Sequence, residues 1–274
     1  SADERVAIHH DPCLNTELCR DSDGKWLEGA TPLVRELAEG QLKAYDVGMI
    51  RPGSSQASRF PLQKSVVGET IPMLSDLVLW WRHLAPHRPT LNIELKSDPR
   101  HPDQSPDPAD YARIVVDELN KWDLLDEVWL QAFDWRVLQE IQRLAPGACT
   151  GYLSSEHEDD ATVSNKDESP WLAGFDPCRF ESSLPKAIKA AGGRFWGPAF
   201  ADTSKDRVLE AQTLGLFVHT WTLNEDEEFG KALNLGVNGV TSDYPDRART
   251  VLRSAGLPVA LPSHTGGQAV GAEQ

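Results

Sequence analysis

The stretch that decides the fold is Thr90-Leu-Asn-Ile-Glu-Leu-Lys96, in which apolar and polar side chains alternate. A period of two is typical of a β-strand and places Asn92, Glu94 and Lys96 on one face, with the apolar residues on the other. Polar groups that face the interior are costly unless they bind something. A buried Glu–Lys pair is the structural alternative, but the position at the carboxyl end of a strand favours a site.

Downstream of this strand, strand and helix patterns alternate. We expect strands at 128–132, 149–153, 194–197, 216–221 and 239–242, and helices at 108–122, 135–144, 184–191, 205–214, 225–235 and 245–254. Strands that alternate with helices of this length predict a parallel sheet. No glycine-rich phosphate loop follows any strand, which argues against nucleotide-binding folds. Six such strands with polar residues at their ends favour a (β/α) barrel over an open sheet.

Upstream of Thr90 the pattern is less regular. A helix is expected at 73–84, a weaker helical pattern covers 33–45, and the Pro-, Gly- and Ser-rich stretch 51–63 indicates a long loop. Near the start, Arg5–Pro12 (RVAIHHDP) predicts a short buried strand that stops at its proline, which cannot donate to a ladder. This strand would deliver His10 beside Asp11, a carboxylate that can orient the imidazole ring.

Length and charge narrow the classes of function. The chain has 274 residues, close to the roughly 250 residues of one α/β barrel. Its net charge of −15 repels polyanions, so we expect no nucleic-acid partner, and no apolar run is long enough for stable membrane insertion. The four cysteines lack metal-type spacing, so we expect buried thiols, with a Cys13–Cys19 disulfide as the alternative.

The candidate site residues lie at the ends of expected strands. Glu94 suits a hard cation such as Mg²⁺ or Ca²⁺, and Lys96 suits a phosphate oxygen. Trp221 is either packing or the wall of a small polar pocket. We expect Asp134 and Asp243 to cap the helices that follow them, with a ligand role as the alternative for Asp243.

Taken in order, these residues resemble the glycerophosphodiester phosphodiesterase family. The resemblance runs from residue 5 to about residue 250, and the order of the pieces is more specific than any single piece. The pieces are His10-Asp-Pro12, Ile71-Pro-Met-Leu74, Asn92-Ile-Glu-Leu-Lys96, Gln131-Ala-Phe133, Trp196-Gly-Pro198, Trp221-Thr-Leu-Asn224 and Thr241-Ser-Asp-Tyr-Pro245.

The resemblance implies a (β/α)8 barrel that hydrolyses glycerophosphodiesters, its small-molecule partners, to an alcohol and glycerol 3-phosphate. It also implies two catalytic histidines and one divalent cation, Mg²⁺ or Ca²⁺, held by three carboxylates. His10 matches the second histidine and Glu94 the third carboxylate. Lys96 matches the basic position beside the phosphate, and Trp221 matches the wall of the glycerol pocket.

The chain departs from the family pattern ahead of His10. The family carries His-Arg-Gly on its first strand and Glu-x-Asp on its second, and residues 1–9 contain neither. We therefore expect a TIM-type barrel without its first two strands, with weak or absent activity and self-association through open sheet edges. This incomplete barrel domain would span 1–256, with a loop insertion at 46–70 and a flexible tail at 257–274.

Two alternative functions also agree with these residues. The chain could be a non-catalytic or decayed relative that binds a phosphorylated polyol, or another barrel phosphodiesterase of the phospholipase type. The sequence shows no apolar interfacial helix, which counts against the second alternative. The compartment is not determined: bacterial periplasm and cytoplasm both agree with a chain that shows no targeting segment.

Overall fold

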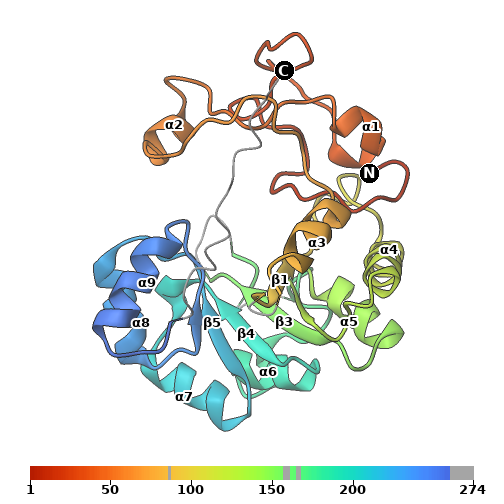
Figure 1. Ribbon diagram of the computed structural model, residues 1–274. Coiled ribbons are helices and arrows are strands. Elements are labelled where there is room, and N and C mark those ends of the chain that lie inside the picture. Colours follow the sequence, from red (N-terminus) through yellow and green to blue (C-terminus); the bar gives the residue numbers. More distant parts are fainter. Residues whose placement is uncertain (86–87, 157–160, 165–167, 260–274) are drawn as a thin grey trace.

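The centre of the molecule is a parallel sheet of six strands in the order β1-β2-β3-β4-β5-β6 (Figure 1). The computed structural model describes residues 1–85, 88–156, 161–164 and 168–259, so most of the expected tail lies outside the described residues. Within this part β1 and β6 each pair on one side only. The predicted TIM-type sheet lacking two strands is therefore confirmed. The strands are Leu91–Glu94 (β1), Val128–Ala132 (β2), Cys149–Ser154 (β3), Phe195–Pro198 (β4), Phe217–Thr220 (β5) and Gly239–Val240 (β6).

Helices follow each strand and cover the outer face of the sheet (Figure 1). Aspartate or serine side chains cap the starts of four of them, including Asp134 at α5, as predicted. The helices expected around the strands are all present, with small differences at their ends. They are α3 (Leu74–Arg82), α4 (Pro108–Lys121), α5 (Trp135–Leu144), α6 (Leu184–Ala190), α7 (Lys205–Thr213), α8 (Asp226–Leu235) and α9 (Pro245–Ser254), with short 3₁₀ turns at Pro177–Arg179 and Phe200–Asp202.

The two faces of the sheet have different roles. On the outer face, apolar strand residues such as Leu130 and Val218 pack against the helices in the main core, together with the fully buried Trp135 and Trp196. On the inner face, register places Glu94 beside Gln131. The alternation predicted for Thr90–Lys96 therefore separates packing residues from candidate site residues.

The expected strand at Arg5–Pro12 is wrong. This segment forms one isolated antiparallel bridge, between Ala7 and Met73, and joins none of the six strands. Its backbone hydrogen bonds lie beside this bridge and at its end: the Ile8 N–H donates to the Pro72 carbonyl at 2.8 Å, and the Val34 N–H donates to the Pro12 carbonyl at 2.9 Å. Alternation over so few residues fits any extended chain, and here the chain pairs with a loop instead of a sheet edge.

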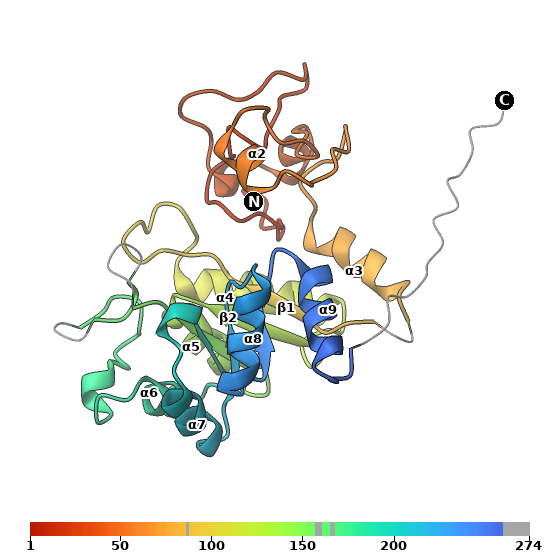
Figure 2. The same cartoon turned by 90° about the vertical axis from the view of Figure 1, so that its left-hand side faces the viewer.

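Residues 1–72 form a layer over one end of the barrel, the N-terminal cap (red and orange in Figures 1 and 2). The cap has its own small core, built around Leu14, Cys19, Leu42 and Ile71. Its only regular elements in the described residues are short: a 3₁₀ turn at Val34–Glu36, α1 (Glu39–Leu42) and α2 (Ser55–Arg59). Helix α2 lies inside the stretch expected to be a loop, because the Ser54 side chain caps its start. All four cysteines are free thiols, and only Cys19 is buried.

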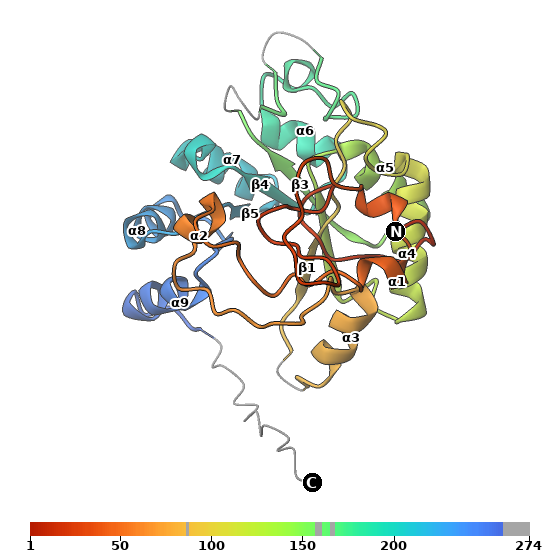
Figure 3. The same cartoon turned by 90° about the horizontal axis from the view of Figure 1, so that it is seen from above.

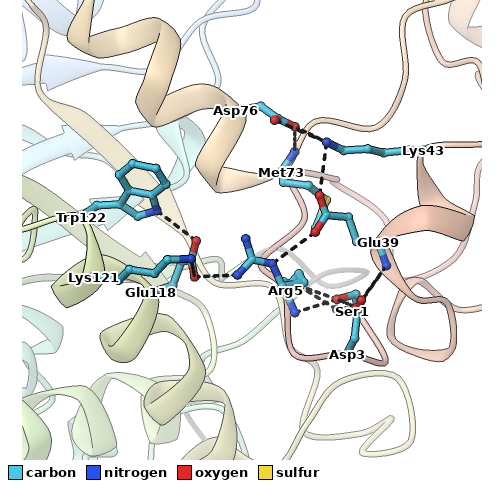
Figure 4. Close-up of polar contacts among 10 residues, drawn as sticks. All are labelled: Ser1, Asp3, Arg5, Glu39, Lys43, Met73, Asp76, Glu118, Lys121 and Trp122. Carbon is cyan, nitrogen blue, oxygen red and sulfur yellow. Dashed lines mark hydrogen bonds and ion pairs between the residues drawn. The ribbon is translucent and has the colours of Figure 1, made fainter.

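Polar contacts hold the cap on the barrel at two sides. At one side, Arg5 lies 3.2 Å from Glu39 of the cap and 3.4 Å from Glu118 of α4 (Figure 4). At the other side, Arg59 lies 3.3 Å from Asp243, and the Tyr244 hydroxyl donates to the Arg59 carbonyl at 3.1 Å. The cap therefore reaches from beside the first strand to the end of the last, as the view from above shows (Figure 3).

Gly151 lies where two strands of the barrel pack closely. A Cβ atom at this position of β3 would lie 1.8 Å from the ring of Phe195, which is itself buried. We expect Gly151→Ala to lower the free energy of unfolding by about 1–3 kcal/mol in urea titrations, because the ring has to move. Gly230→Ala, in α8 where no atom lies within 4 Å, should raise it by about 0.5–1 kcal/mol. Changes of the same sign would contradict this account.

Candidate active site at the carboxyl ends of the strands

The four residues predicted for the site meet in one place. His10, Glu94, Lys96 and Trp221 all line a cavity of about 400 Å³. The barrel also contributes Gln131 from β2, and His10 is the cap's contribution to the lining. The sequence thus identifies residues that lie together although up to 211 positions separate them (10 to 221).

Three of these side chains form a continuous polar row. Lys96 Nζ lies 2.8 Å from Glu94 Oε1 and 3.1 Å from His10 Nε2. Since an ammonium group can only donate, the Nε2 atom of His10 accepts and must be unprotonated in this arrangement. The ring proton then resides on Nδ1, an assignment that follows from the hydrogen-bond network.

Asp11 orients the His10 ring. His10 Nδ1 donates to Asp11 Oδ1 at 2.8 Å, and Asn15 Nδ2 donates to the other carboxylate oxygen at 2.8 Å. Burial raises the pKa of Asp11, but these two hydrogen bonds, together with electrostatic interactions with His10 and His9, outweigh it, so the pKa lies below its usual range. The carboxylate therefore stays ionised and keeps the His10 Nε2 atom available to accept a proton, the arrangement that a general base requires. The His10 side chain itself is 81% exposed, at the rim of the cavity.

The barrel holds the backbone that carries Lys96. The Lys96 N–H donates to the Tyr111 hydroxyl at 3.2 Å, and burial raises the pKa of Tyr111 to about 12, so that hydroxyl keeps its proton. The next residue, Ser97, donates to the unexposed carboxylate of Asp134 at 3.0 Å. Arg136 pairs with the same carboxylate at 2.8 Å. Asp134, the residue that caps the start of α5, thus also fixes the turn after β1.

Aromatic side chains form the opposite wall. The rings of Phe133 and Trp221 meet edge to face with centroids 5.3 Å apart, and Phe133 meets Trp171 at 6.4 Å. The guanidinium group of Arg100 lies 5.1 Å from the centre of the Trp171 ring and is held by Asp98 at 2.7 Å. The cavity therefore has an apolar side, suited to a carbon skeleton, and a cationic side, suited to an anion.

Several lining residues were not found from the sequence, Arg100 and Trp171 among them, and one capping prediction is wrong. Arg100 and Trp171 lie in loops with no periodicity or spacing that would single them out. Asp243 does not cap α9, where Tyr244 is the first cap residue. Instead it accepts a hydrogen bond from Asn224 at 2.9 Å and pairs with Arg59 of the cap. No signal local to Asp243 distinguishes these two uses.

The residues present do not complete a divalent-cation site. Across the described ranges, no group of three or more His, Cys, Asp or Glu side chains is placed to hold a metal ion. Among the residues that the structure describes, Glu94 is the single carboxylate that lines the cavity, and its buried Oε1 has Lys96 at 2.8 Å but without hydrogen-bond geometry. A hard cation takes about six or more oxygen ligands, so one carboxylate is one part of a site.

Comparison with known families gives a match over most of the chain. The model of the glycerophosphoryl diester phosphodiesterase family matches residues 1–247. A solved structure from Silicibacter pomeroyi DSS-3, assigned as a glycerophosphoryl diester phosphodiesterase, is 32% identical with a TM-score of 0.82, covering 95% of this chain and 82% of that one.

Two further similarities are weaker, one in sequence identity and the other in the share of the chain that it covers. An Oleispira antarctica phosphodiesterase, solved in complex with the product sn-glycerol-3-phosphate, shares the fold with a TM-score of 0.62 at 20% identity, over 92% of this chain and 81% of that one. Human lysophospholipase D GDPD1 is 42% identical over 40 residues, which span 15% of this chain and only 13% of that protein. Among the described helices, none has the length and apolar character of a membrane span.

Proposed function

The chain belongs to the glycerophosphoryl diester phosphodiesterase family, and we propose that it hydrolyses glycerophosphodiesters in the cavity lined by His10, Glu94, Lys96 and Trp221. The observation that carries the proposal is the row Asp11–His10–Lys96–Glu94. In this row an oriented imidazole ring lies next to the ammonium group of Lys96 at the strand ends. The products would be an alcohol and glycerol 3-phosphate.

His10 would move the proton in this reaction. Its Nε2 atom, which now accepts from Lys96 at 3.1 Å, becomes free to take a proton from the attacking hydroxyl or return one to the leaving oxygen once Lys96 binds phosphate. Asp11 holds the ring in the tautomer that this role needs. It is a positioning residue, because it lies behind the ring.

Lys96 would bind a phosphate oxygen. Its ammonium group lies between Glu94 and His10, so a phosphate at this position would be held next to the atom that moves the proton. Trp221 and Phe133 would cover the glycerol carbons on the other side of the cavity.

Glu94 is the residue that we assign to the divalent cation, Mg²⁺ or Ca²⁺, that the family generally uses. The cation would neutralise charge on the phosphoryl group. The described residues supply only one carboxylate to the cavity. The roles proposed above for His10, Lys96 and Trp221 therefore do not depend on a bound cation.

Replacing Lys96 by methionine tests the assignment of the phosphate. We expect kcat/KM for glycerophosphocholine to fall about 10- to 100-fold, the value of a hydrogen bond to a charged group. Lys96→Arg should recover part of the loss. The control is Lys25→Met, a lysine of the cap whose side chain is 76% exposed. Equal effects of Lys96→Met and Lys25→Met would remove Lys96 from the phosphate site.

We also propose that the unpaired edges of β1 and β6 favour self-association. A strand that pairs on one side only offers free backbone groups to another chain. Size-exclusion chromatography with light scattering tests this: a single monomeric species across a wide concentration range would contradict it.

A further inference from the structure

A run of exposed apolar side chains lies in the cap, outside the cavity. Every residue from 61 to 69 is exposed, and the side chains include Leu62 at 78%, Val66 at 52% and Val67 at 73% exposure. Single exposed apolar residues are ordinary, but three within six positions of one loop form a patch. We call residues 61–68 the apolar loop.

The backbone of the apolar loop is held in place, so the exposure of its side chains is a built feature. The Val66 N–H donates to the Gly48 carbonyl at 2.8 Å, and the Gly68 N–H donates to Asp46 at 3.0 Å. A Cβ atom on Gly48 would collide with the Val66 carbonyl oxygen at 1.7 Å, which shows how closely the two segments approach. The apolar side chains thus point away from a fixed base.

The apolar loop carries one charged residue, the cation Lys64, in a chain whose net charge is −15. Residues 47–68 carry three basic residues and no acidic one, although Asp46 and Glu69 border this stretch. Arg51 pairs with Glu28 and Arg59 with Asp243, so their charges are offset, while Lys64 lies within the apolar loop itself. Lys64 is therefore the charge that an anionic surface would meet at this loop.

The chemistry of the patch favours a lipid surface over a protein partner. Its three side chains are aliphatic, and protein interfaces rely instead on Trp, Tyr and Arg anchors. Three side chains also fall well short of the roughly 800 Å² per partner that a stable dimer buries. Aliphatic groups flanked by a lysine are what an anionic lipid interface accepts, because the alkyl groups enter the acyl region and the ammonium meets phosphate.

We propose that the apolar loop is a contact site for anionic lipid surfaces, with Leu62, Val66 and Val67 inserted and Lys64 among the headgroup phosphates. The loop follows α2 and its C-cap residue Phe60, and both Arg59, the last residue of α2, and Phe60 contact Tyr244 at the carboxyl end of the sheet. The contact would therefore hold the end of the barrel that carries the cavity close to a membrane. Binding of the apolar loop to lipid does not depend on the proposed hydrolysis.

Cosedimentation with vesicles tests the proposal at low ionic strength. Vesicles of equal parts phosphatidylglycerol and phosphatidylcholine should retain the protein weakly and reversibly, and vesicles of phosphatidylcholine alone should retain less. The double variant Leu62→Asp/Val67→Asp should lose about tenfold in partition coefficient for each side chain. Lys64→Gln should lose about fivefold, and only with the anionic vesicles.

A matched double variant serves as the control. Leu144→Asp/Leu209→Asp changes two exposed leucines, 40% and 63% exposed, on α5 and α7, helices that lie beside the sheet and outside the cap (Figure 1), and it should bind vesicles like the unaltered protein. The milder double variant Leu62→Ser/Val67→Ser should also lose binding. It shows that the loss comes from the missing apolar side chains and not from a fold disturbed by the aspartates. No vesicle binding by the unaltered protein, or equal losses in the two aspartate doubles, would overturn the proposal. Hydrolysis of soluble glycerophosphocholine should be the same in all these variants, so failure of the contact and failure of the proposed reaction are told apart.

Discussion

Replacement of His10 by alanine is expected to lower kcat for glycerophosphodiester hydrolysis by about 10²–10⁴-fold, the range for loss of a general acid or base. The physical reason is the arrangement of the ring: Asp11 fixes its tautomer at 2.8 Å, and its Nε2 atom faces Lys96 in the cavity. The KM should change little, because proton transfer contributes in the transition state and not to binding of the ground state.

The measurement is the steady-state release of glycerol 3-phosphate from glycerophosphocholine. Because the His10 side chain is 81% exposed, the fold of the variant should stay intact, which circular dichroism and urea unfolding can verify. His83→Ala, an exposed histidine at the end of α3, is the control and should leave kcat unchanged. A decrease of less than tenfold for His10→Ala would remove His10 from the mechanism.

Replacement of Trp135 by alanine should have the largest effect on stability, a loss of about 3–5 kcal/mol in the free energy of unfolding. Trp135 is fully buried, its ring meets Tyr152 edge to face at 4.8 Å, and its indole N–H donates to the Leu153 carbonyl at 3.1 Å. Truncation leaves a cavity between α5 and the sheet and an unpaired carbonyl, in a domain whose total stability is of the order of 5–15 kcal/mol.

Urea unfolding followed by circular dichroism measures this loss. The matched control is Trp80→Ala on α3, where the same change is made on a side chain that is 58% exposed. We expect the control to stay within about 0.5 kcal/mol of the unaltered protein. If both variants lost similar stability, burial of Trp135 could not be the cause.

The sequence predicts the barrel well, because its information is local there. Alternation in Thr90–Lys96 and the helical pattern of 135–144 are each decided within one element, and both agree with the structure. The same local signal misled at Arg5–Pro12, since an extended segment that pairs with the loop at Met73 alternates like a strand. Periodicity reports the local conformation but does not identify the partner of a segment.

The candidate site shows the same division. Glu94, Lys96 and Trp221 could be found from their places at strand ends, and His10 through the resemblance of its motif; all four line the cavity. Their catalytic and binding roles remain predictions. Arg100 and Trp171 come from loops that only the tertiary fold brings to the wall, where they stack at 5.1 Å. The sequence of neither loop predicts this contact between Arg100 and Trp171.

The anchor between Arg59 and Asp243 also bears on the order of events during biosynthesis. The two residues are 184 positions apart, so the cap leaves the ribosome long before its partner at the end of β6 exists. At roughly 5–20 residues per second, about 10–40 s separate their synthesis. During that time the cap can form its own small core around Leu14 and Leu42. Arg59 cannot yet form its ion pair, because Asp243 has not been synthesised. The entrance to the cavity can therefore be completed only after the end of β6 has been made, although the segment that covers it is synthesised well before.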